Sequence, residues 1–98
     1  MSDRRIRFTL GDEAWEIDLG ALTLNDQIVL QRLASDRPWA RLLTAFDEGD
    51  AEAVKVLLWA ARRASGESVA YDDPSMNPRA RDLSSAVLAA EQAVPAPE

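Results

Sequence analysis

The sequence contains no cysteine and no histidine. Their absence excludes disulfides, zinc sites built on thiolate or imidazole ligands, and catalytic arrangements of the Ser-His-Asp or Cys-His type. Long apolar runs are also missing, since no stretch approaches the roughly 18 apolar residues that span a bilayer. The N-terminal segment MSDRRIRF lacks the apolar part of a secretory signal. We therefore expect a cytoplasmic protein with no metal, no cofactor and no membrane partner.

Positive charge is scarce: 11 Lys and Arg residues stand against 17 Asp and Glu residues, and the net charge is −6. Proteins that bind nucleic acid usually carry a basic excess. The basic cluster at Arg4, Arg5 and Arg7 has acidic partners available in Glu16 and Asp18 of the next predicted strand. We therefore expect no nucleic-acid partner.

The length and composition suit one small domain. The chain has 98 residues, with a hydrophobic share of 47% and a charged share of 29%, which are ordinary values for a globular chain. The last residues combine prolines with a single apolar anchor, Val94. We expect a single domain over residues 1–93 and a disordered tail over residues 94–98.

Two segments near the N-terminus alternate between apolar and polar residues. Residues 5–10 and 14–19 each have the period of two that is typical of half-buried strands. The turn-forming cluster Gly11-Asp12-Glu13 lies between them. We expect an antiparallel hairpin with one apolar face. The predicted cross-strand pairs are Leu10 with Trp15, Phe8 with Ile17, Ile6 with Leu19, and Arg7 with Asp18.

Capped segments with helical periodicity follow the hairpin. Thr23 and Asp26 resemble a capping box and predict a helix from about 24 to 35. A second helix begins near Pro38 and ends at Gly49, and Asp50 is a good N-cap for a third, over about 51–65. The main apolar stripes are Val29, Leu30 and Leu33 in the first helix, Trp39, Leu42, Leu43 and Phe46 in the second, and Val54, Leu57, Leu58 and Ala61 in the third.

The C-terminal part is predicted to be a connector at residues 67–78 and an Ala-rich last helix at about 79–93. That helix would place Leu83, Val87, Ala90 and Val94 in one line. The expected fold class is therefore α+β and mostly helical, with an N-terminal β-hairpin followed by three to four short helices.

The predicted helix at 51–65 carries apolar residues outside its main stripe. At 100° per residue, Val56 and Trp59 point away from that stripe. Either a second element of the fold covers them, or they belong to an interface. Since Arg63 follows Trp59 by four residues and would stack on its ring, we name Val56, Trp59 and Arg63 as the candidate partner-binding residues. The same kind of surface would serve self-association.

Catalytic and metal sites are not expected. The acidic pairs Asp72-Asp73 and Asp47-Glu48 do not follow the spacing of a calcium loop. No hydroxyl group has a visible base to activate it. We interpret the acidic residues as helix caps, turn residues and solvated surface.

A series of short motifs runs along the chain: F-x-L-G, W-E-I-D-L, A-L-T-L-N-D, P-W-x-x-L-L, E-G-D, L-L-W-A-A-R-R-A-S-G, E-S-V-A-Y-D-D-P and R-D-L. In this order they resemble the small tail assembly chaperones, or tail-assembly proteins, of long-tailed (siphovirus-like) phages and prophages of actinobacteria. The most suggestive stretch is Leu57 to Gly66, followed by Val69, Tyr71 and Asp72. The likeness spans about residues 6–83. The chain departs from the family in its short Ala-Pro tail.

The resemblance implies a protein that is not an enzyme. Such chaperones coat the long, helix-rich tape-measure protein before the tail tube polymerises around it, and they leave before the virion matures. The implied partner is a tape-measure-like protein, met in the host cell cytoplasm if the gene is phage-encoded, and a homo-oligomer is compatible. A different class stays open, namely a small bacterial regulatory or antitoxin-like module that binds one protein partner. The neighbouring genes distinguish the two.

Overall fold

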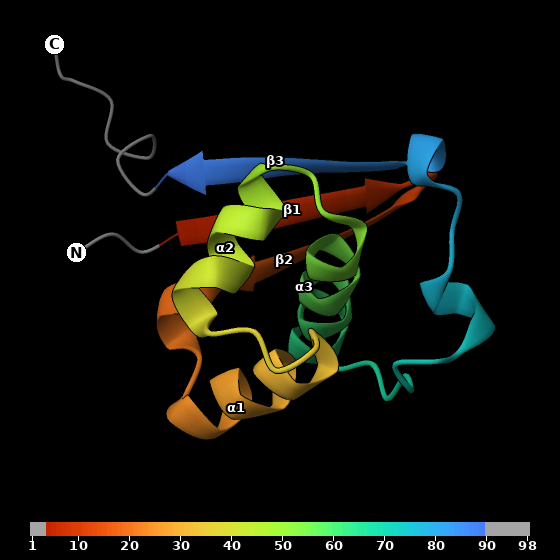
Figure 1. Ribbon diagram of the computed structural model, residues 1–98. Helices are drawn as coiled ribbons and strands as arrows, with labels where there is room; N and C mark the ends of the chain where they lie inside the picture. Colours follow the sequence, from red (N-terminus) through yellow and green to blue (C-terminus); the bar gives the residue numbers. More distant parts are fainter. Residues whose placement is uncertain (1–3, 90–98) are drawn as a thin grey trace, which may run out of the picture.

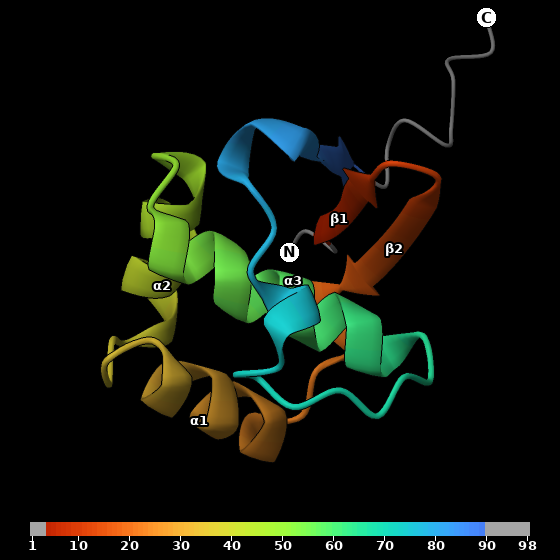
Figure 2. The same ribbon diagram turned by 90° about the vertical axis from the view of Figure 1, so that its right-hand side faces the viewer.

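The computed structural model describes residues 4–89, which form a sheet with a layer of helices on one face (Figure 1). The sheet is antiparallel and has three strands in the order β2-β1-β3. Helix α3 contacts the sheet and both other helices, and α1 and α2 lie on its outer side (Figure 2). The elements are β1 (Arg4–Leu10), β2 (Glu13–Asp18), α1 (Leu24–Leu33), α2 (Trp39–Asp47), α3 (Ala51–Ala64) and β3 (Leu83–Ala89), with short 3₁₀ turns at Leu19–Ala21, Pro74–Met76 and Ala80–Asp82.

The predicted α+β class, with an N-terminal hairpin and three helices, is confirmed, and about half of the described chain is helical. The predicted tail at 94–98 and the end of the predicted domain at 90–93 lie outside the described residues. Among the helices at positions 4–89, none is long and apolar enough to cross a membrane.

Strands β1 and β2 form the predicted hairpin, but their register is shifted by two residues. Phe8 pairs with Trp15, and Leu10 pairs with Glu13 across a two-residue turn. Gly11 in this turn has a φ of 60°, as the first central residue of a type II′ turn requires. A shift of two residues keeps every side chain on its predicted face. The observed pairs replace all four predicted ones: Ile6 faces Ile17, Arg7 faces Glu16, and Arg5 faces Asp18.

The prediction of a last helix at 79–93 is wrong over the residues that the structure describes, which end at residue 89. Residues Leu83–Ala89 form strand β3, which pairs antiparallel with β1. Leu83 faces Leu10 and Val87 faces Ile6, so the side chains expected to line one helix face follow the apolar face of the hairpin instead. Pairing satisfies backbone groups along an edge of β1 that a helix would leave open. This gain outweighs the helix propensity of an Ala-rich segment.

The starts of α1 and α3 follow the predicted caps, whereas α2 begins after Pro38 without a side-chain cap. In α1, the Thr23 hydroxyl accepts a hydrogen bond from the Asp26 N–H at 3.1 Å, and the Asp26 carboxylate accepts one from the Thr23 N–H at 3.0 Å. In α3, the Asp50 carboxylate accepts a hydrogen bond from the Ala53 N–H at 3.2 Å. These bonds satisfy amides that a helix leaves unpaired in its first turn.

The core lies between the sheet and the helices. Phe8 and Phe46 meet edge to face with ring centroids 6.1 Å apart. The predicted stripes of α2 and α3 are buried at Leu42, Phe46, Leu57, Leu58 and Ala61 and partly buried at Trp39, Leu43 and Val54. The stripe predicted for α1 is only partly correct, because Leu30 is buried but Val29 is exposed.

Candidate binding surface

The three candidate partner-binding residues have different surroundings. Val56 is fully buried and Trp59 is 8% exposed, so the expectation that they form an open apolar patch is wrong. Helix α3 lies between the sheet and the other two helices, which explains why apolar residues around much of its circumference are covered. Arg63 is exposed. Its guanidinium lies 4.7 Å from the centre of the Trp59 ring, as the spacing of four residues predicted.

The element that covers Trp59 is the connector after α3. The indole N–H of Trp59 donates a hydrogen bond to the carbonyl oxygen of Val69 at 2.8 Å. The Tyr71 ring meets the indole edge to face, with the ring centroids 6.0 Å apart, and the Lys55 ammonium lies 4.5 Å from the centre of the Tyr71 ring. Trp59 therefore fixes the path of the connector across α3.

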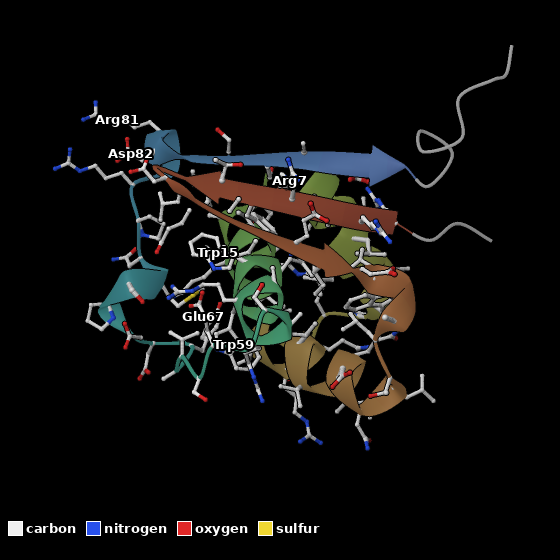
Figure 3. All side chains as sticks on the ribbon, turned by 180° about the vertical axis from the view of Figure 1, so that it is seen from behind. Arg7, Trp15, Trp59, Glu67, Arg81 and Asp82 are labelled. Atoms are coloured by element: carbon white, nitrogen blue, oxygen red, sulfur yellow. The ribbon has the colours of Figure 1, made fainter. Side chains whose placement is uncertain are left out.

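A second tryptophan fixes the start of the same connector (Figure 3). The indole N–H of Trp15 donates to the Glu67 carboxylate at 2.6 Å, and Arg62 donates to the same carboxylate at 2.9 Å. Arg62 also lies 5.1 Å from the centre of the Trp15 ring. The bonds from Trp15 and Arg62 lower the pKa of the Glu67 carboxyl, because they stabilise its charged form. Glu67 could not be identified from the sequence, because its partners Trp15 and Arg62 lie on two other elements.

Three of the four large apolar side chains that are exposed in the described residues lie on α1, and the fourth is Val87 of β3. Leu24 is 76% exposed, Ile28 44% and Val29 43%. Leu24 and Ile28 are four residues apart and lie along one line of the helix, while Val29 lies at the rim of a neighbouring hollow. At 100° per residue, Leu24 and Ile28 fall outside the stripe of Val29, Leu30 and Leu33 that the sequence predicts for this helix, and the sequence pattern does not assign them to a surface. These apolar residues outside the predicted stripe are the sequence feature that could have identified the exposed surface of α1.

The hollow beside α1 is lined in part by two of the predicted site residues, Trp59 and Arg63. It has a volume of about 380 Å³ and lies between α1 and the C-terminal half of α3. Val29 and Leu30 line it from α1, and Trp59 and Arg63 line it from α3. Trp59 and Arg63 thus border the exposed side of α1, whereas Val56 takes no part. We call Leu24, Ile28, Val29 and this hollow the α1 surface.

The acidic and basic residues have structural roles. The pKa of Asp50 is lowered by the hydrogen bond from Arg37 and by the Ala53 N–H, and the pKa of Asp73 is lowered by the N–H of Ser75. The N-terminal arginines form ion pairs, Arg4 with Asp47 and Arg7 with Glu16 at 2.6 Å. Within residues 4–89, no group of three acidic side chains is placed to hold a metal ion.

No protein-family model, no curated protein and no solved structure matches the chain.

Proposed function

We propose that this chain is a non-enzymatic tail-assembly-chaperone-like protein that binds a tape-measure protein through the α1 surface, in the cytoplasm where phage tails are assembled. The motifs from Phe8 to Leu83 support the family, and the apolar residues on α1 support the mode of binding. The single observation that carries the binding site is the exposure of three large apolar residues on one helix, with Leu24 and Ile28 along one line and Val29 beside the hollow.

The α1 surface suits an amphipathic helix as its partner. Large apolar side chains at one helical spacing present a ridge, and the hollow between α1 and α3 offers a shallow groove next to it. A partner helix that lays its apolar face on such a surface buries side chains spaced three and four residues apart. A tape-measure protein is long and helix-rich, so it would offer this face many times along its length.

Residues around the α1 surface add to this mode of binding. Arg63 lies at the edge of the hollow with its guanidinium over the Trp59 ring, and arginine is enriched among the residues that dominate protein interfaces. Asp26 lines the same hollow from α1. Charges of both signs therefore flank the apolar ridge. The net charge of −6 keeps the free protein from clumping through its apolar surface.

The test measures binding to a tape-measure fragment encoded beside this gene. Leu24→Glu combined with Ile28→Glu puts two charges on the ridge, and we expect it to weaken binding roughly tenfold or more. The matched control is Ala40→Glu combined with Thr44→Glu, which adds the same two charges at the same spacing to exposed positions of α2. The control should bind like the unmodified chain. Thermal melts establish that both variants are folded.

The outcomes separate the two function classes. If no segment of the tape-measure protein binds the unmodified chain, the chaperone proposal is wrong. If the neighbouring gene encodes a toxin that binds and the α1 variant loses it, the chain is an antitoxin-like module. If both double variants bind equally well, the partner uses a different surface.

A further inference from the structure

The two edges of the sheet differ in their side chains. The edge formed by β2 carries Glu13, Glu16 and Asp18, three acidic residues in a strand of six. The edge formed by β3 runs Leu83-Ser84-Ser85-Ala86-Val87-Leu88-Ala89 and contains no charged residue, proline or glycine. Charges, prolines and bulges are the usual features that keep an edge strand from pairing with another chain. The β2 edge has such protection, and the β3 edge has none.

The β3 edge is also open in the described part of the chain. Strand β3 pairs with β1 along seven residues, and no other strand within residues 4–89 lies beyond it (Figure 3). Because successive amides of a strand point to alternate sides, about half of the backbone groups of β3 face outward. Val87 is 42% exposed even though it follows the apolar face of the sheet.

We propose that two copies of this chain pair antiparallel through their β3 edges and form a six-stranded sheet. A twofold axis at Ala86, the middle residue of β3, makes the contact self-complementary. In this register Ala86 faces Ala86 of the second copy, and Val87 faces Ser85. Small side chains meet at the axis, and each exposed Val87 gains a neighbour on the helix-bearing face. This surface is distinct from the α1 surface, so the proposal does not rest on the proposed function.

The charges of the chain restrict the place where a second copy can dock, and the β3 edge is such a place. Two molecules of net charge −6 repel each other, so they can approach closely only where neither presents charge. The β3 edge meets this condition along its whole length. A twofold contact also closes on itself, and the acidic β2 edges left at the two ends of the enlarged sheet oppose further addition. We therefore expect a dimer and no filament.

The main test is sedimentation equilibrium of the full chain over a range of concentrations. We expect reversible dimerisation with a midpoint of about 100 µM, because a paired edge buries less than the roughly 800 Å² per partner of a standard interface. Ala86→Glu puts two carboxylates opposite each other at the axis and should weaken the dimer about fivefold. Within one molecule the new carboxylate faces Arg7 on β1, which suits the fold.

Two controls isolate the β3 edge. Ala14→Glu makes the same change at an exposed alanine of the β2 edge, and it should leave dimerisation unchanged. A mixture of the Ala86→Glu and Ala86→Lys variants should regain dimerisation, since opposite charges then face each other at the axis. A monomeric unmodified chain at millimolar concentration would overturn the proposal. So would equal weakening by Ala14→Glu and Ala86→Glu, or failure of the mixture to recover.

The absence of cysteine permits a direct test of the register. Directly opposed residues of an antiparallel pair have Cβ atoms about 4.5–5.5 Å apart, close to the separation that a disulfide needs. Ala86→Cys should therefore form a disulfide-linked dimer under mild oxidation much faster than Ala14→Cys. Equal rates would mean that the copies do not meet at Ala86.

Discussion

Helices α3 and α1 use their apolar residues in opposite ways. Helix α3 buries residues on several sides, from Ala53 to Ala61, because it lies between the sheet and the other helices. Helix α1 buries only Leu30 and leaves Leu24, Ile28 and Val29 exposed. Both helices have apolar residues outside a single stripe. The pattern alone therefore does not separate core from interface, and the position of the helix in the fold decides between them.

The largest loss of stability is expected at Trp59, and it tests whether the apolar residues of α3 outside its main stripe belong to the core. Trp59→Ala removes a nearly buried indole, its edge-to-face contact with Tyr71 and its hydrogen bond to Val69. We expect the free energy of unfolding to fall by about 3–5 kcal/mol. Urea denaturation followed by circular dichroism measures the loss. If the free energy of unfolding falls by less than about 1 kcal/mol, Trp59 contributes little to the core, and the interface role that the sequence suggested becomes the better interpretation.

The next effect concerns the end of α3 and depends on pH. The lowered pKa of Glu67 means that the unfolded chain takes up a proton at a higher pH than the folded chain. The stability that Glu67 contributes is therefore present above its ordinary pKa of 4.5 and is lost as the pH falls through the lower folded value.

Glu67→Gln tests this contribution. The variant should be less stable than the unmodified chain at neutral pH, and the difference should shrink as the pH falls below 4.5. The lowered pKa values of Asp50 and Asp73 remain in the variant, so its own stability still declines with acid. Denaturation curves between about pH 7 and pH 3 give the comparison. A difference that stays constant with pH would show that the Glu67 charge adds nothing.

The parts of the fold that were predictable are set by neighbouring residues. Thr23 with Asp26, and Asp50 with Ala53, form caps within a single turn, so the starts of α1 and α3 follow from the sequence. The hairpin faces were also predictable because they depend only on alternation. The register was not, because a shift of two residues preserves that alternation. The two-residue turn at Gly11 and Asp12 decided it.

The parts that were missed depend on contacts between distant residues. Leu83–Ala89 becomes a strand because β1, which lies 73 to 85 positions earlier in the chain, offers it an edge to pair with. Local propensity carries no information about so distant a partner. Trp59 is covered by Val69 and Tyr71, which the sequence placed in a connector without assigning them a contact. Of the predicted site residues, Arg63 lies at the surface and Val56 lies in the core. The binding surface that we propose is therefore on α1.

The smallest effect on stability is expected at Leu24, and it tests the comparison with a matched pair. Leu24→Ala removes a side chain that is 76% exposed, whereas Leu57→Ala removes one that is fully buried in α3. The first should change the free energy of unfolding by no more than about 0.5 kcal/mol, and the second should lower it by about 2–5 kcal/mol. Urea denaturation of both variants under the same conditions measures the difference. Both variants replace a helical leucine with alanine, so the change in helix propensity is nearly the same in the two. The difference between their free energies of unfolding therefore reflects burial. Equal losses would mean that α1 is packed against the rest of the fold as closely as α3, and the α1 surface would then have no apolar ridge to offer a partner.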